Sequence, residues 1–177
     1  MNGTDNVVGI VLAGGKSSRM GGGDKCLAPL GGTPLLAHVL ARLRPQVSRI
    51  AVSANGDLSR FDVFGLPVLA DGIAGFQGPL AGIEAGLSWV AANYPQAVWA
   101  MTVPGDTPFI PDDLVVRLVQ AARGATMAVA RSDEGMHPVV GLWPMEMAGA
   151  LRQALESAST RSSISIVQKI STLQRSC

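Results

Sequence analysis

The sequence predicts an α/β fold, a three-layer αβα sandwich with a mostly parallel sheet. Short apolar runs recur along the chain, stretches with helical spacing lie between several of them, and glycine or proline marks many boundaries. Strands that alternate with helices are typical of a sheet covered on both faces. The 177 residues predict one domain, whose ends at residues 1–6 and about 160–177 are expected to be poorly ordered.

The first half of the chain contains three apolar runs and one helical pattern. The continuous run at residues 7–13 suits a strand that a parallel sheet buries on both faces. Pro34 then opens a helix, because the apolar residues from Leu35 to Leu43 recur at helical spacing. The two further strands are expected at residues 50–54, ending at Asn55, and at residues 67–70, ending at Asp71.

The second half repeats this alternation. Gly78 and Pro79 open a helix with one apolar face, and the apolar run at residues 98–103 predicts a fourth strand. Pro111 starts a third helix, with acidic residues in its favourable first turn. The remaining elements are strands at residues 126–130 and 139–143 and a helix that starts at Pro144.

Four polar or glycine residues follow predicted strands. They are Gly14, Asn55, Asp71 and Asp106. In open α/β sheets, ligands bind in the crevice at the carboxyl ends of the strands. We therefore expect these residues to lie along one edge of the sheet and to form the binding site.

Charge and composition argue against several classes of protein. The net charge of +1 provides no overall field for nucleic acid or an anionic membrane. The run at residues 7–13 is too short to span a bilayer, and the polar start lacks the basic flank of a signal peptide. Cys26 and Cys177 form no metal or disulfide spacing, which fits a reducing compartment. We expect a cytoplasmic protein, with a monomer as the favoured state.

The loop after the first predicted strand is rich in glycine and in cations. Five glycines lie between residues 14 and 23, and glycine lets main-chain N–H groups approach an anion closely. Lys16, Arg19 and Lys25 add three positive charges within ten residues. A polyphosphate needs this combination of donors and charge. The alternative is a surface loop with solvated lysines, which is nearly as good a reading for Lys16.

Two common phosphate-binding loops do not fit this segment. A P-loop that ends at Gly15-Lys16-Ser17 needs glycine at position 10, which is Ile10. A dinucleotide fingerprint that starts at Gly14 needs glycine at position 16, which is Lys16. The loop is therefore of another kind.

The stretch LAGGKSSRMGGGDK, residues 12–25, closely resembles the signature of the molybdenum cofactor guanylyltransferases. These belong to a superfamily of nucleotidyltransferases with a Rossmann-like α/β sheet, the type that also handles nucleotide-diphospho-sugars. The Gly14-Gly15 pair resembles the guanylyl branch, since the related cytidylyltransferases usually show Ala-Ala-Gly there. The resemblance covers roughly residues 7–158, and its further landmarks are Asn55, Asp71, residues 78–82, residues 104–108 and residues 137–139.

The resemblance implies an activity and a set of site residues. The implied reaction transfers GMP from GTP to the terminal phosphate of molybdopterin, releases pyrophosphate and depends on Mg²⁺. Arg19, Lys25 and Asp106 would be catalytic, with Asp106 as the metal ligand. The implied nucleotide-binding residues are Leu12, Ala13, Gly14, Gly15, Lys25, Asn55, Asp71, Gly78, Pro79 and Asp106. GTP and molybdopterin are the implied partners, with cofactor-insertion proteins as a further possibility.

Each candidate side chain also has an ordinary structural reading. Asp106 could cap a following helix, and Asp71 could face water at a strand end. Asn55 could be an ordinary turn residue before Gly56. His137 is expected to be a structural histidine.

Two other functions stay open. One keeps the fold and changes the substrates, giving a cytidylyltransferase or a sugar-phosphate nucleotidylyltransferase. The other is a GTP-binding module with impaired catalysis. It is suggested by the end of the chain, because family members continue to an Asn-x-Asn-Thr-Pro-like turn, whereas this sequence has no asparagine after residue 93.

Overall fold

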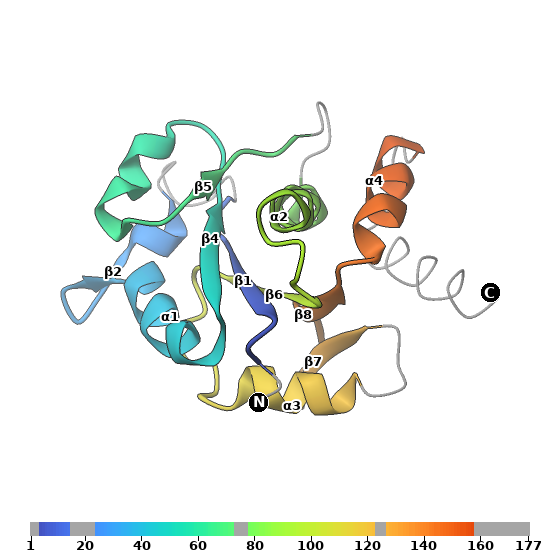
Figure 1. Cartoon of the computed structure of the whole chain (residues 1–177). Helices are drawn as coiled ribbons and strands as arrows, with labels where there is room; N and C mark the ends of the chain where they lie inside the picture. The colour runs from blue at the N-terminus through green and yellow to red at the C-terminus, as the bar shows by residue number, and fades with distance from the viewer. Residues whose placement is uncertain (1–3, 15–23, 73–77, 123–126, 158–177) are drawn as a thin grey trace.

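The computed structural model describes residues 4–14, 24–72, 78–122 and 127–157. A six-stranded sheet forms its centre, in the order β5-β4-β1-β6-β8-β7 (Figure 1). The predicted α/β class is confirmed, whereas the chain ends at residues 1–3 and 158–177 lie outside the described residues. The strands are β1 (Val7–Leu12), β4 (Arg49–Ser53), β5 (Val68–Leu69), β6 (Trp99–Pro104), β7 (Ala128–Ser132) and β8 (Gly135–Pro144).

The sheet is parallel over four of its strands. β4 pairs in parallel with both β1 and β5, and β6 pairs in parallel with β1. The carboxyl ends of these four strands therefore lie at one edge. β8 runs antiparallel to β6 and to β7, so the sheet is mostly parallel, as predicted, with a reversed strand near one side.

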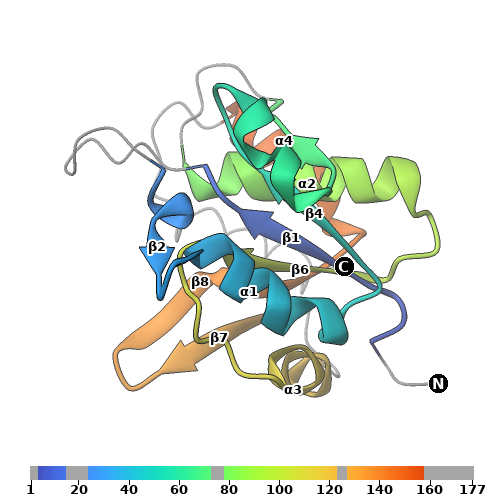
Figure 2. The same cartoon turned by 90° about the vertical axis from the view of Figure 1, so that its left-hand side faces the viewer.

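Helices cover both faces of the sheet (Figures 1 and 2). α1 (Leu35–Leu43) and α3 (Leu114–Ala121) pack on one face and share an apolar layer with side chains such as Val11 and Met101. α2 (Pro79–Asn93) and α4 (Met147–Ser157) pack on the other face, around Ile10 and Trp143. The predicted three layers are therefore present. Within the described residues, no helix is both long and apolar enough to cross a membrane.

Two glycines of α2 allow the helix to lie close to the sheet. A Cβ atom at Gly86 would come within 2.7 Å of the Ile10 side chain, and one at Gly82 within 2.7 Å of the Ser53 hydroxyl oxygen. Larger residues at these positions would push α2 away from β1 and β4. Since Pro79 is the first residue of α2, this close packing also fixes the position of the helix start.

Two predicted helix starts are wrong. Pro144 pairs with Trp99 across the sheet and ends β8, so α4 begins only at Met147. Asp112 and Asp113 lie in the turn before α3, which begins at Leu114 and has no acidic residue in its first turn. The sequence pattern also missed a short hairpin and three 3-10 helices. They are η1 (Lys25–Leu27), β2 (Pro29–Leu30), β3 (Thr33–Pro34), η2 (Arg44–Gln46) and η3 (Leu58–Phe64).

Candidate functional site

A cavity of about 240 Å³ lies where β1 and β6 end. The backbone N–H of Ala13 donates to the Ser53 carbonyl oxygen at 2.8 Å, and that of Gly105 donates to the Leu12 carbonyl oxygen at 2.9 Å. These bonds hold the ends of the neighbouring strands together at the cavity. Six predicted site residues line it, namely Leu12, Ala13, Gly14, Lys25, Pro79 and Asp106, together with Cys26, Pro104 and Val139. The prediction that strand-end residues gather at one edge is thus confirmed for Gly14 and Asp106.

Opposite charges face each other in this cavity. The Nζ atom of Lys25 lies 3.0 Å from Oδ2 of Asp106. Lys25 belongs to η1 after the glycine-rich loop, whereas Asp106 follows β6, so the pair joins two segments far apart in sequence. The lysine side chain is 62% exposed and the aspartate 29%, which leaves both accessible to a ligand. A polyanion with a bound cation could pair with each of them.

Asn55 and Asp71 bind one another beside the cavity and do not line it. Nδ2 of Asn55 donates to Oδ2 of Asp71 at 2.5 Å, and Oδ1 of Asn55 accepts from the Asp71 backbone N–H at 3.1 Å. This double contact joins the segments that follow β4 and β5. The Asn55 amide also lies next to Gly14, 3.6 Å from where a Cβ atom of Gly14 would be.

The N-terminus of α2 forms another side of the cavity. Gly78 precedes the helix with φ of +147°, a backbone conformation that glycine adopts without strain. Pro79 then occupies the first helical position and lines the cavity. No side chain caps the first turn, and the positive end of the helix dipole lies at this side of the cavity.

The cavity offers few side-chain ligands to a divalent cation. The described residues contain no group of three or more His, Cys, Asp or Glu side chains that could enclose a metal ion. Asp106 supplies one carboxylate at the cavity. Mg²⁺ keeps several waters and is commonly held by one or two carboxylates plus substrate phosphates. The residues therefore fit a metal that arrives with a nucleotide.

Cys26 is a cavity residue that the sequence pattern did not indicate. Its side chain is buried, and Sγ donates a weak hydrogen bond to the Ala13 carbonyl oxygen at 3.7 Å. Burial, with a smaller contribution from the nearby Asp24 charge, raises the pKa of the thiol to about 11. A buried neutral thiol packs as a small apolar group, so its role here is to support the cavity wall.

The glycine-rich loop contributes three further candidates. Gly15, Lys16 and Arg19 lie outside the described residues, and their predicted roles stay predictions.

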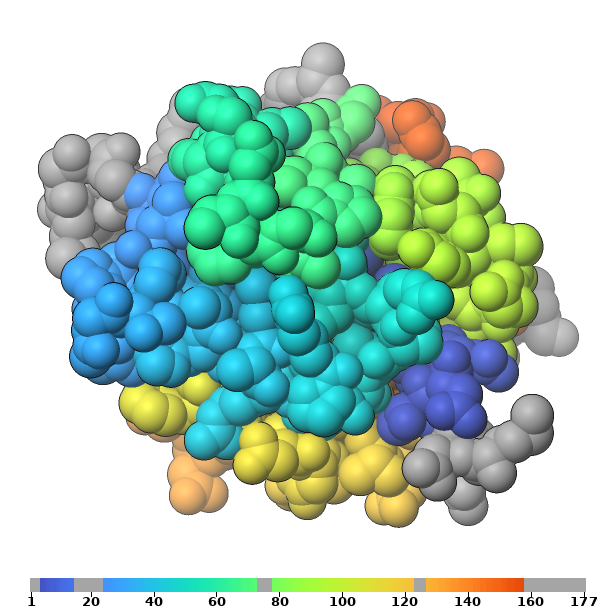
Figure 3. Space-filling view, turned by 60° about the vertical axis from the view of Figure 1, so that its left-hand side comes forward, coloured from blue at the N-terminus to red at the C-terminus, as the bar shows by residue number. Residues whose placement is uncertain are grey.

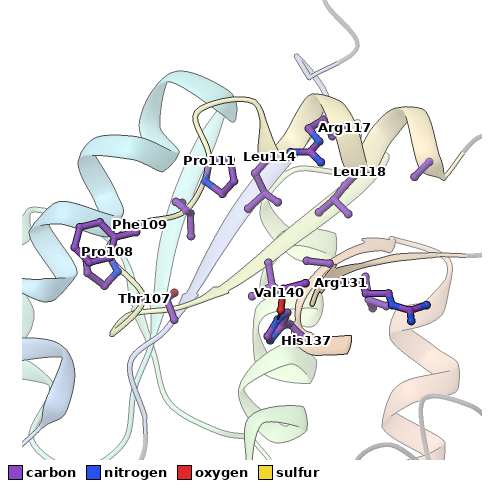
Figure 4. Close-up of a pocket in the computed structure, with 15 residues that line it drawn as sticks. Thr107, Pro108, Phe109, Pro111, Leu114, Arg117, Leu118, Arg131, His137 and Val140 are labelled. Carbon is purple, nitrogen blue, oxygen red and sulfur yellow. Dashed lines mark hydrogen bonds between the residues drawn. The ribbon is translucent and has the colours of Figure 1, made fainter. Parts of the chain in front are cut away.

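A second cavity, of about 690 Å³, lies between α3 and the β7–β8 hairpin (Figure 4). Its lining is mainly apolar and includes Phe109, Leu118 and Val140, and it contains none of the predicted nucleotide-binding residues. His137 also lines it, and Nε2 of this histidine lies 2.7 Å from the Ser132 hydroxyl oxygen. The predicted structural role of His137 agrees with that hydrogen bond.

A family model described as a MobA-like NTP transferase domain matches residues 9–172. The chain belongs to this family. It is therefore a nucleotidyltransferase, and the resemblance carried by residues 12–25 is confirmed.

Similar proteins with assigned names agree with this family. The molybdenum cofactor guanylyltransferase of Rhodopseudomonas palustris (strain BisB5) is 54% identical over 148 residues, which are 82% of this chain and 70% of that protein. The protein of the same name from Mesorhizobium japonicum is 54% identical over 159 residues, covering 88% and 76%.

Solved structures share the fold. A crystal structure of molybdopterin-guanine dinucleotide biosynthesis protein A from Archaeoglobus fulgidus superposes with a TM-score of 0.71 at 18% identity, covering 92% of this chain and 79% of that one. A Mycobacterium tuberculosis protein in complex with manganese gives a TM-score of 0.61 at 20% identity, covering 82% and 74%.

Proposed function

We propose that this enzyme transfers GMP from GTP to the terminal phosphate of molybdopterin or the molybdenum cofactor and releases pyrophosphate, in the cytoplasm and with Mg²⁺. The named relatives at 54% identity support a role in molybdenum cofactor biosynthesis. The observation that carries the proposal is the pair of Lys25 and Asp106, which face each other at 3.0 Å in the cavity after β1. That arrangement offers one group for phosphate oxygens and one for a metal ion.

The proposed reaction needs no nucleophile from the protein. A phosphate oxygen of the acceptor attacks the α-phosphorus of GTP, and the bond from that phosphorus to the oxygen bridging to the β-phosphorus breaks. The electron pair leaves with pyrophosphate. Lys25, with Arg19 in the same role, stabilises the charge on the phosphates. Leu12, Ala13 and Gly14 would receive the base along their backbone, with Asn55 and Asp71 beside it.

Asp106 would hold the magnesium ion. The ion would supply neutralisation of the developing phosphate charge and orientation of the in-line displacement. In the structure the Asp106 carboxylate pairs with Lys25. Arrival of the metal and the triphosphate would give each partner a new contact of opposite charge, so neither is left buried and unpaired.

A transfer assay tests the proposal. The protein is incubated with GTP, Mg²⁺ and molybdopterin, and released pyrophosphate is measured beside an Asp106→Asn variant. That variant keeps the shape of the side chain and removes its charge. We expect pyrophosphate release by the wild type and a loss of at least about 100-fold in the variant. Equal release by the two proteins would rule out the role of Asp106.

Nucleotide choice is tested by competition. GTP should bind more tightly than CTP or UTP in calorimetry with Mg²⁺. A preference for CTP would replace the guanylyl assignment with a cytidylyl one. Tight GTP binding without product under any metal condition would instead support a binding module without catalysis.

A further inference from the structure

Arg60 connects two segments of the site that are far apart in sequence. Its Nε and Nη2 atoms both donate to the carboxylate of Asp24, the latter at 3.3 Å. Nη2 also donates to the backbone carbonyl oxygen of Asn55 at 2.7 Å. The Arg60 and Asp24 side chains are only 25% and 20% exposed, so solvent screens this ion pair less than a typical surface pair.

Local contacts orient the Arg60 side chain for this bridge. Nη1 donates to the backbone carbonyl oxygen of Asp57, and Cζ lies 4.7 Å from the centre of the Phe61 ring. Phe61 is fully buried in η3 and gives the guanidinium a fixed surface to stack on. In the space-filling view, the green segment that contains η3 lies directly against the blue segment around residues 24–30 (Figure 3).

The residues on either side of Lys25 are both held in place, one of them by the bridge. Asp24 precedes Lys25 and is held by Arg60. Cys26 follows Lys25 and is anchored to Ala13 through its thiol. Cys26 also packs so tightly on Gly105 that a Cβ atom there would lie 3.1 Å from the Cys26 Cβ. With both neighbours fixed, the Lys25 side chain is directed at Asp106.

We propose that Arg60 is a positioning residue: by joining Asp24 to Asn55, it holds Lys25 in the place from which its ammonium group meets the phosphates of the nucleotide. The inference rests on the proposed function for its catalytic consequence. The predicted position of Lys25 can be tested without turnover.

The contacts require an arginine. Four of the five N–H donors of the guanidinium are used, one from Nε, one from Nη1 and two from Nη2. Lysine presents its donors from a single atom and cannot reach the Asp24 carboxylate and two backbone oxygens in the same fork. Arg60→Lys therefore keeps the charge and removes the bridge. Arg49→Lys on β4 is the matched control, because Arg49 is exposed and donates to the carbonyl oxygen of its neighbour Ser48.

The first measurement is hydrogen exchange of the free protein. The backbone N–H of Leu27 donates to the backbone carbonyl oxygen of Asp24 at 3.0 Å, and that of Ala28 donates to the backbone carbonyl oxygen of Lys25 at 3.1 Å. We expect faster exchange at these two amides in Arg60→Lys and in Asp24→Asn. In both variants the backbone amides of the sheet should keep their wild-type exchange rates. The control Arg49→Lys should exchange like the wild type at every amide. Unchanged exchange at Leu27 and Ala28 would overturn the proposal.

The second measurement is a double-variant cycle. Arg60→Lys should lower kcat/KM for GTP by about 10- to 100-fold in the wild-type background. In a Lys25→Ala background the same change should lower it by less than about twofold, because Arg60 then has no lysine to position. An equal loss in both backgrounds would show that Arg60 does not act through Lys25, which would also overturn the proposal. If the wild type shows no turnover, the proposed function fails, and the exchange rates decide the positional claim by themselves.

Discussion

The two cavities on either side of the turn at residues 104–107 differ in size and in chemistry. The smaller, of about 240 Å³, contains the Lys25–Asp106 ion pair and the backbone after β1. The larger, of about 690 Å³, is lined mainly by apolar side chains of α3, β7 and β8. Asp106 lines the first and Thr107 the second, so adjacent residues face different spaces.

This difference teaches that volume alone does not identify the site. A triphosphate with its metal ion needs a cation and a carboxylate, and the smaller cavity contains both in Lys25 and Asp106. Residues of β8 line both spaces: Val139 lines the smaller cavity, whereas His137 and Val140 line the larger. Gly14 and Lys25, the described residues at the two ends of the glycine-rich segment, line the smaller cavity.

The strongest test of the comparison removes one group from each cavity. Lys25→Met deletes the ammonium group and keeps the aliphatic stem, so the initial rate of pyrophosphate release should fall about 100-fold. Phe109→Ala in the larger cavity should change the rate by less than about twofold, since Phe109 is 77% exposed and lies away from the ion pair. Comparable losses in the two variants would mean that the larger cavity takes part in the reaction.

The position of the candidate site could be predicted from the sequence because it depends on strand ends. Apolar runs mark where buried strands stop, and parallel pairing then brings Gly14, Asn55, Asp71 and Asp106 to one edge without further information. The glycines and cations of the glycine-rich loop indicated that the ligand is a polyphosphate. These features are local in sequence or follow from the fold class.

The features that were missed depend on contacts between distant segments. Arg60 is 36 residues from Asp24, and no local pattern indicates that they meet. The reversal of β8 was not predicted either, since an apolar run is the same in both strand directions. Pro144 was read as a helix start because proline favours that position, but its pairing with Trp99 makes it the end of a strand.

A buried hydroxyl that joins β6 to β8 provides a test of stability. The Thr102 hydroxyl on β6 is fully buried, donates to the Val139 carbonyl oxygen at 2.8 Å and accepts from Nε1 of Trp143 at 2.9 Å. Thr102→Val keeps the shape but leaves the buried indole N–H without this acceptor, so the free energy of unfolding should fall by about 2 to 3 kcal/mol. Urea unfolding measures this loss, and Thr102→Ser is the control that retains the hydroxyl. A valine variant more stable than the serine variant would show that the hydroxyl does not hold β8 in place.

The smallest expected effect concerns Cys26, the buried thiol that lines only the smaller of the two cavities. Its pKa rises from 9.0 to about 11 on folding. Between these pH values the unfolded thiol has lost its proton while the folded one keeps it, so the unfolded state binds fewer protons and stability falls as the pH rises. The stabilisation is fully present below pH 9 and lost toward pH 11, with a magnitude of at most about 3 kcal/mol. Urea unfolding of wild type and Cys26→Ala at several pH values measures this loss of stability, because Cys177 and the other alkaline groups are common to both proteins.

The free energy of unfolding of the wild type should fall more steeply with pH across this interval than that of Cys26→Ala. Two parallel curves would mean that water reaches the thiol and that the wall of the smaller cavity is open at this point.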